Sequence, residues 1–142
     1  MSLFSKHSQA MSDSASVVVV EDSPEIADMI MVAFSIFGIQ AVHTDDGAEG
    51  LKLVKACRPR VALLDIQLPH MNGYEICAAI QSDPALRDTR IVMMTGLLDD
   101  ASEHATQEWR RKMDVADFIA KPFDAKELMA RVQPLLNAHA NI

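Results

Sequence analysis

Residues 17–25 read VVVVEDSPE, and this segment joins a strand pattern to an acidic pair and then to a helix start. Four consecutive valines form a continuous apolar run, which is typical of a strand covered on both faces in a parallel sheet. Glu21 and Asp22 follow directly, and Pro24 stands at a first helical position, where proline is favoured. The segment therefore predicts a strand–loop–helix unit with two carboxylates at the carboxyl end of its strand.

The same alternation of a short apolar run and an amphipathic segment recurs along the chain. Further strand patterns lie at residues 40–44, 61–64, 91–94 and 118–120. Helical spacing of apolar residues occurs at 26–37, 48–55, 74–80, 100–113 and 124–135, the last two opened by the capping-box pairs Asp100/Glu103 and Asp124/Glu127. Five strands that alternate with five helices predict an α/β fold, a doubly wound parallel sheet with helices on both faces.

Polar side chains follow four of the five apolar runs. Glu21 and Asp22 come after the first run, Asp65 after the third, Thr95 after the fourth and Lys121 after the fifth. Because the carboxyl ends of parallel strands meet at one edge of a sheet, and sites form there, we expect these side chains to converge. The sequence therefore predicts three carboxylates, one hydroxyl and one ammonium in a single crevice.

This set of groups is suited to phosphoryl transfer. Crowded carboxylates repel one another, and a hard divalent cation such as Mg²⁺, which prefers oxygen ligands, relieves the repulsion. Phosphoryl transfer needs an aligned nucleophile and positive charge around the phosphoryl oxygens. Asp65 is the candidate nucleophile, because carboxylates form acyl phosphates. Mg²⁺ and Lys121 would supply the charge, and Thr95 one hydrogen bond.

Composition excludes several other classes. The 142 residues carry a net charge of −7, which repels a phosphate backbone, so we expect no direct nucleic-acid binding. No apolar run approaches the length of a membrane span. Cys57 and Cys77 show no metal-binding spacing and indicate a reduced, cytoplasmic protein. We expect residues 1–15, which are polar and rich in serine, to be a flexible tail, and residues 16–142 to form one domain.

Four motifs resemble the receiver domains of response regulators, of the chemotaxis type, over residues 17–137. They are VVVVEDSPE at 17–25, LLDIQLPHMNGYE at 63–75, IVMMTG at 91–96 and FIAKPF at 118–123. Their order on alternating strands and helices makes the resemblance specific. It implies a flavodoxin-like (βα)5 fold with strand order 2-1-3-4-5, in a protein of a two-component phosphorelay.

The resemblance also implies roles for individual residues. Asp65 would be the phosphorylation site, and Thr95 and Lys121 would contact the phosphoryl oxygens. At the metal site, Asp22 and Asp65 would ligate Mg²⁺ directly, Glu21 would support it largely through water, and the carbonyl of Gln67 would be a further ligand. No other cofactor is implied. The Lys121–Pro122 bond is expected to be cis.

Signalling in such domains implies a switch and partners. Thr95 would move toward the phosphoryl group and Phe118 would turn inward, so that the face made by helix four, strand five and helix five changes shape. The donor would be a histidine kinase or a histidine phosphotransfer protein. The output would be a separate protein target or an output domain outside this chain. Glu127 and Arg131 partly resemble the charged positions of dimers formed through that face, which leaves a dimer open.

Alternative interpretations remain at this stage. Phe118 could be a packed core residue that does not switch. An aspartyl phosphate also forms in haloacid-dehalogenase-type phosphatases, but these resemble a DxD pattern, and the residue two after Asp65 is Gln67. A degenerate receiver that accepts no phosphate is disfavoured by the full acidic set. We therefore expect a signalling switch and not an enzyme with turnover.

Overall fold

The computed structural model describes residues 15–96 and 114–140. These residues form a five-stranded parallel sheet in the order β2-β1-β3-β4-β5, which confirms the predicted fold class and strand order. The strands are β1 (Val17–Val20), β2 (Ala41–Thr44), β3 (Val61–Asp65), β4 (Arg90–Thr95) and β5 (Asp117–Ala120). The strand order reverses between β1 and β3, so a crevice forms outside the carboxyl ends of these two strands.

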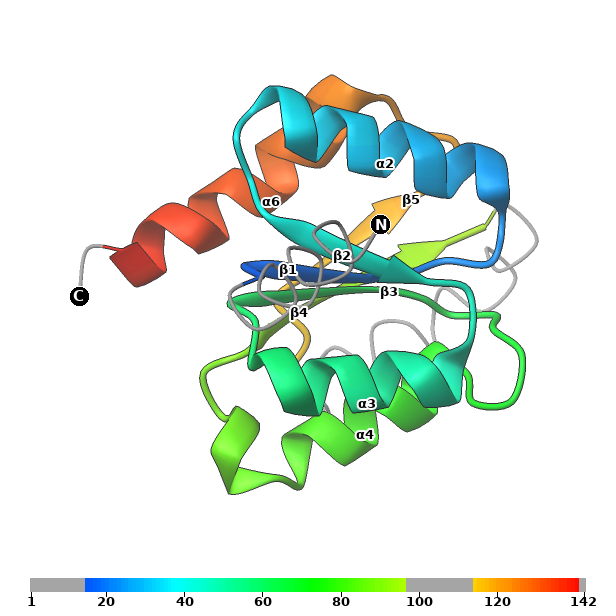
Figure 1. The fold of residues 1–142 in the computed structure, drawn as a ribbon, viewed down its shortest axis with the longest axis vertical. Helices are drawn as coiled ribbons and strands as arrows, with labels where there is room; N and C mark the ends of the chain where they lie inside the picture. The colour runs from blue at the N-terminus through cyan, green and yellow to red at the C-terminus, as the bar shows by residue number, and fades with distance from the viewer. Residues whose placement is uncertain (1–14, 97–113, 141–142) are drawn as a thin grey trace, which may run out of the picture.

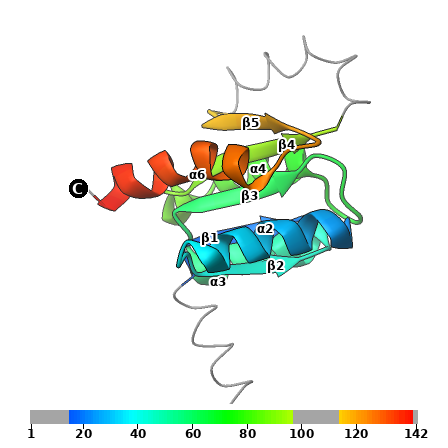
Figure 2. The same ribbon diagram turned by 90° about the horizontal axis from the view of Figure 1, so that it is seen from above.

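Helices cover both faces of the sheet. They are α2 (Pro24–Ile36), α3 (Gly47–Cys57), α4 (Gly73–Gln81) and α6 (Ala125–Ala140), with a short 3₁₀ helix η1 (Pro84–Leu86) after α4. Figure 1 shows α2 and α6 on one face and α3 and α4 on the other, and Figure 2 shows the same arrangement from above. The helix predicted at 100–113 lies outside the described residues, and so does the predicted tail except for Ala15, which is buried.

Side-chain caps begin the four α-helices where the sequence places short polar residues. The acceptors are Ser23 for Ile26 N–H, Asp46 for Glu49 N–H, Asn72 for Glu75 N–H and Asp124 for Glu127 N–H. The last of these is the cap predicted from Asp124 and Glu127. At the other end of α3, Arg58 adopts a left-handed backbone with φ of 46°, which terminates the helix before Pro59 as predicted.

Both faces of the central strands are buried, which explains their continuous apolar runs. In β1, Val17 and Val19 pack in the cluster that contains Phe34 of α2, whereas Val18 and Val20 pack in the cluster that contains Ile76 of α4. All four valines have no exposed surface.

Within the described residues, no helix is both long and apolar enough to cross a lipid bilayer.

We predict that Phe34→Ala lowers the free energy of unfolding by about 3–5 kcal/mol, because it empties a fully buried position between the sheet and α2. Ile36→Ala on the same helix is the matched control, since Ile36 is 75% exposed and its loss should change stability by less than about 0.5 kcal/mol. Urea unfolding measures both. Equal effects of the two substitutions would contradict this packing.

Candidate functional site

The acidic residues predicted from the sequence meet at the carboxyl edge of the sheet. Glu21 and Asp22 follow β1, and Asp65 is the last residue of β3, which pairs with β1 in parallel. One carboxylate oxygen from each of the three residues lies within 4.8 Å of the others. Glu21 and Asp65 are buried, whereas Asp22 is exposed. The crevice therefore concentrates negative charge, and Asp22 lies on its solvent-exposed side.

Lys121 bridges the two buried carboxylates. Its Nζ lies 2.9 Å from Asp65 Oδ2, to which it donates a hydrogen bond, and 2.7 Å from Glu21 Oε1. The lysine side chain is 17% exposed, so the ion pairs are only partly screened by water. Lys121 follows β5, and its amide donates to the carbonyl of Thr95 at 2.7 Å, which anchors the segment to the end of β4. The Lys121–Pro122 bond is cis, as expected.

Glu21 is held in place by three contacts. Its Oε2 accepts a hydrogen bond from Ser23 N–H at 3.0 Å, and its backbone carbonyl accepts one from His43 Nε2 at 2.8 Å. Oε1 is buried and lies 2.7 Å from the Lys121 ammonium, which is its charged partner. Both carboxylate oxygens of Glu21 therefore have a partner that fixes the side chain in the crevice.

Burial and neighbouring charge act together on Asp65. Desolvation raises the pKa of Asp65 to about 7, with a further rise from the negative charge of Glu21, while Lys121 acts in the opposite direction. Burial alone would lower the pKa of Lys121, but the two carboxylates outweigh it and raise the pKa. The Lys121 ammonium is therefore charged. Because the pKa of Asp65 stays raised beside it, Lys121 alone does not fully stabilise the ionised form of Asp65, and a further cation would do so.

The remaining predicted residues lie near this cluster. Gln67 N–H lies 3.4 Å from Asp65 Oδ1 and donates to it. Thr95 ends β4 next to β3 and is partly buried; in the described part of the chain its hydroxyl makes no hydrogen bond to Asp65. Phe118 is 9% exposed and packs in the core cluster on the α4 side of the sheet. The ring is thus already buried in this structure.

The chemistry of the donor set fits a hard divalent cation. Three carboxylates offer oxygens within 4.8 Å of one another, and the Lys121 ammonium faces the two that are buried. Oxygen-rich sites with net negative charge suit Mg²⁺, which keeps some of its water and often completes its shell with a phosphate oxygen. Exposed Asp22 leaves the cluster accessible from solvent.

Several contacts around the site were not predicted from the sequence. His43 supports the Glu21 carbonyl from β2, and Nδ1 of His70 makes a hydrogen bond with the carboxylate of Asp46 at the start of α3. Gly47 lies directly against the backbone of Met71. Histidine and glycine have many roles in proteins, so their positions in the sequence do not predict these contacts. The polar residues at 45–47, which suit the start of a helix, are the local indication that the sequence offers.

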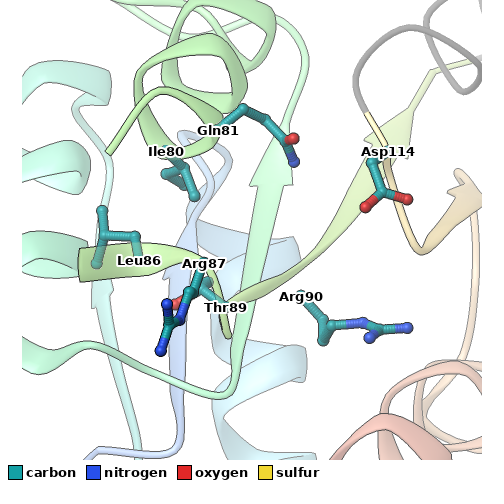
Figure 3. A pocket seen from close by; sticks show the side chains of 7 residues that line it. All are labelled: Ile80, Gln81, Leu86, Arg87, Thr89, Arg90 and Asp114. Atoms are coloured by element: carbon teal, nitrogen blue, oxygen red, sulfur yellow. The ribbon is translucent and has the colours of Figure 1, made fainter. Parts of the chain in front are cut away.

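A separate pocket with a volume of about 170 Å³ lies at the opposite end of the sheet (Figure 3). Gln81 at the end of α4, Arg90 at the start of β4 and Asp114 before β5 lie around it. These residues mark the amino ends of β4 and β5. The pocket therefore does not belong to the acidic site.

Comparison with known proteins places this site in a family. The family model for the response regulator receiver domain matches residues 17–133. The DNA-binding response regulator MtrA of Mycolicibacterium smegmatis is 33% identical over 120 residues, which are 84% of this chain and 50% of that protein. The chain spans about half the length of the curated relatives it matches.

Solved structures show the same fold. The chemotaxis response regulator CheY4 of Vibrio cholerae is 26% identical and superposes with a TM-score of 0.76, covering 86% of this chain and 98% of that one. The receiver domain of a sensor histidine kinase from Pseudomonas aeruginosa, solved with magnesium in its active-site cleft, is 23% identical with a TM-score of 0.74, covering 87% and 98%. With the matched family model and the observed strand order, these likenesses show that the chain belongs to the response regulator receiver domain family of two-component systems.

Proposed function

We propose that Asp65 is the phospho-acceptor of this receiver domain and that it takes its phosphoryl group from a phosphohistidine on a histidine kinase or phosphotransfer protein. The observation that supports this most strongly is the Lys121 ammonium, which bridges Asp65 and Glu21 at 2.9 and 2.7 Å. A buried carboxylate beside a fixed ammonium has both the nucleophile and part of the charge that phosphoryl transfer requires.

The transfer is a displacement at phosphorus. One carboxylate oxygen of Asp65 forms a bond to phosphorus as the bond from phosphorus to the donor imidazole nitrogen breaks. The electron pair of the broken bond stays on the imidazole, and the product is an acyl phosphate on Asp65. Lys121, which contacts Asp65 Oδ2, is positioned to stay beside the phosphoryl oxygens as charge moves onto them.

Mg²⁺ is the cation we propose for the acidic cluster, where it would neutralise phosphoryl oxygens and keep Asp65 ionised. The carboxylates of Glu21, Asp22 and Asp65 would hold it, with the backbone carbonyl of Gln67 as a further ligand. Because burial raises the pKa of Asp65 to about 7, a bound cation would shift the carboxyl group toward its nucleophilic form at neutral pH.

Phosphorylation would act as a switch through local charge. Thr95 would move toward the new phosphoryl group, and Phe118 would repack, altering the face that includes β5 and α6. Because Phe118 is buried in this structure, its movement on phosphorylation would start from a ring that is already packed in the core. Hydrogen exchange with and without beryllofluoride tests the route: altered protection across residues 101–131 is expected, and an unchanged pattern would exclude it.

We propose that the domain is cytoplasmic and acts by docking, with no sustained turnover of a phosphate ester. Its partners would be the phosphohistidine donor and either a separate protein target or an output domain, without contact of its own to nucleic acid or membrane. Arg131, one of the residues that suggested a dimer, binds Asp117 at 2.9 Å within the same chain. Sedimentation with and without beryllofluoride decides the oligomeric state: an unchanged monomer would remove the dimer.

Intact-mass measurement tests the phospho-acceptor directly. The domain is incubated with acetyl phosphate, with Mg²⁺ or with a chelator, beside Asp65→Asn. We expect the mass of one phosphoryl group to be added only when Asp65 and Mg²⁺ are both present. Equal labelling of Asp65→Asn, or labelling that does not depend on Mg²⁺, would refute the proposal.

A further inference from the structure

The loop between β3 and α4, residues 66–72, lies against the N-terminus of α3. Gly47 N–H donates a hydrogen bond to the carbonyl of Pro69 at 3.1 Å. Asp46 uses its two carboxylate oxygens for different partners. Oδ1 accepts from Glu49 N–H and caps α3, while Oδ2 pairs with Nδ1 of His70. One side chain therefore joins the start of α3 to the loop.

Gly47 allows the closest approach between the two segments. A Cβ at this position would lie 1.6 Å from the backbone oxygen of Met71, which no side chain could accommodate without displacing the loop. A second glycine, Gly73, closes the other end of the loop, because its Cβ would lie 2.4 Å from the carbonyl oxygen of Asp65. The loop is thus packed backbone to backbone at both ends.

His70 needs these supporting contacts because its backbone conformation is energetically unfavourable for a residue other than glycine. Its φ of 68° lies in the left-handed region, which costs energy for a residue with a Cβ and persists where surrounding contacts hold it. Hydrogen bonds from Glu49 N–H and from His70 lower the pKa of Asp46, so the carboxylate is charged at neutral pH. The contact spans 24 residues of sequence and fixes the loop at an exposed residue.

We propose that Asp46, Gly47 and His70 form a brace that positions the 66–72 loop, and with it Gln67 and Asp65, for Mg²⁺ binding and phosphoryl transfer. The link to the site is direct, because Gln67 N–H donates to Asp65 Oδ1 at 3.4 Å. The three are positioning residues, since none of them is among the ligands proposed for Mg²⁺ or the groups proposed to contact the phosphoryl oxygens. The inference rests on the proposed role of Asp65.

Conservative variants distinguish the effect of losing the brace from a general effect on folding. Asp46→Asn keeps a good helix cap but removes the charge that faces His70. His70→Asn keeps a residue that tolerates the left-handed backbone but removes the imidazole. Gly47→Ala displaces the loop itself. Glu49→Gln is the matched control, because it removes one carboxylate charge from the same helical turn, where the Glu49 side chain pairs with exposed Lys52.

The readout is Mg²⁺ affinity, measured by isothermal titration calorimetry, with the unfolding midpoint recorded for each protein. We expect the Mg²⁺ dissociation constant to rise about 2- to 5-fold for Asp46→Asn and for His70→Asn, and no further when the two are combined. Gly47→Ala should raise it about 10-fold. Glu49→Gln should leave it unchanged. A role confined to stability would lower the midpoint without changing the affinity.

Wild-type affinity in both Asp46→Asn and His70→Asn, or additive effects in the double variant, would overturn the brace. The calorimetry measures Mg²⁺ binding and does not depend on phosphoryl transfer. If Asp65 accepted no phosphoryl group, the proposed function would be refuted, but the calorimetry would still test the brace. If the wild-type protein bound no Mg²⁺ at all, the brace would be refuted as well.

Discussion

Lys121→Met is expected to slow the phosphorylation of Asp65 by about 10²- to 10³-fold, the range found when one fixed donor is removed from a developing negative charge. The ammonium is 2.9 Å from Asp65 Oδ2 and is positioned by the end of β4 through the Thr95 carbonyl. Methionine fills a similar volume without the charge. The rate of mass gain with acetyl phosphate and Mg²⁺ measures the effect.

The same substitution should also lower stability. Glu21 has no exposed surface, and without Lys121 its buried charge loses its ammonium partner, which costs about 3–5 kcal/mol. Part of this loss should return when Mg²⁺ is added. Lys126→Met, at an exposed position of α6, is the control and should change neither rate nor stability. A Lys121→Met protein with the wild-type rate would show that the ammonium has no part in the transfer.

The metal-free domain is expected to lose stability as the pH rises from about 4 to about 7. The folded pKa of Asp65 is raised to about 7 from an ordinary value of 3.8, so the folded state binds more protons than the unfolded state between these values. Stability falls with pH wherever the folded state holds the extra proton. A shift from 3.8 to about 7 makes the contribution of Asp65 on the order of 4 kcal/mol.

Comparison of variants isolates this carboxyl group from the others in the chain. Asp65→Asn should be more stable than wild type at pH 8 in the absence of metal, and the difference should disappear near pH 4. Mg²⁺ should reduce the difference at pH 8, because it stabilises only the ionised site. Asp28→Asn, at an exposed position of α2, should follow the wild-type curve. Parallel curves for wild type and Asp65→Asn across this range would contradict the raised pKa.

The sheet and the acidic cluster could be predicted because each depends on residue type at a position that the fold rule fixes. The four valines of 17–20 read as a strand buried on both faces, and they are so in the structure. The strand then determines where Glu21 and Asp22 lie. Asp65 and Lys121 follow from the same rule, since parallel strands end at a common edge.

The brace could not be predicted, because it depends on loop geometry. The contact of His70 with Asp46 requires a left-handed residue in one loop and a helix cap in another, and the sequence at 45–47 indicates the cap but not its meeting with His70. The 3₁₀ helix η1 was missed for a related reason: Asp83 and Pro84 also suit an ordinary turn. Phe118 shows a different limit, since its strand pattern predicts burial but not whether the ring moves.

Chemical mapping of the acceptor tests the central claim most directly. The domain is treated with acetyl phosphate and Mg²⁺, reduced with borohydride, which converts an aspartyl phosphate to homoserine, and digested for peptide mass analysis. We predict homoserine at position 65, with none in Asp65→Asn or after chelation of Mg²⁺. Homoserine at Asp22 or at another aspartate, or a phosphoryl group that resists borohydride, would contradict the assignment of Asp65 as the phospho-acceptor.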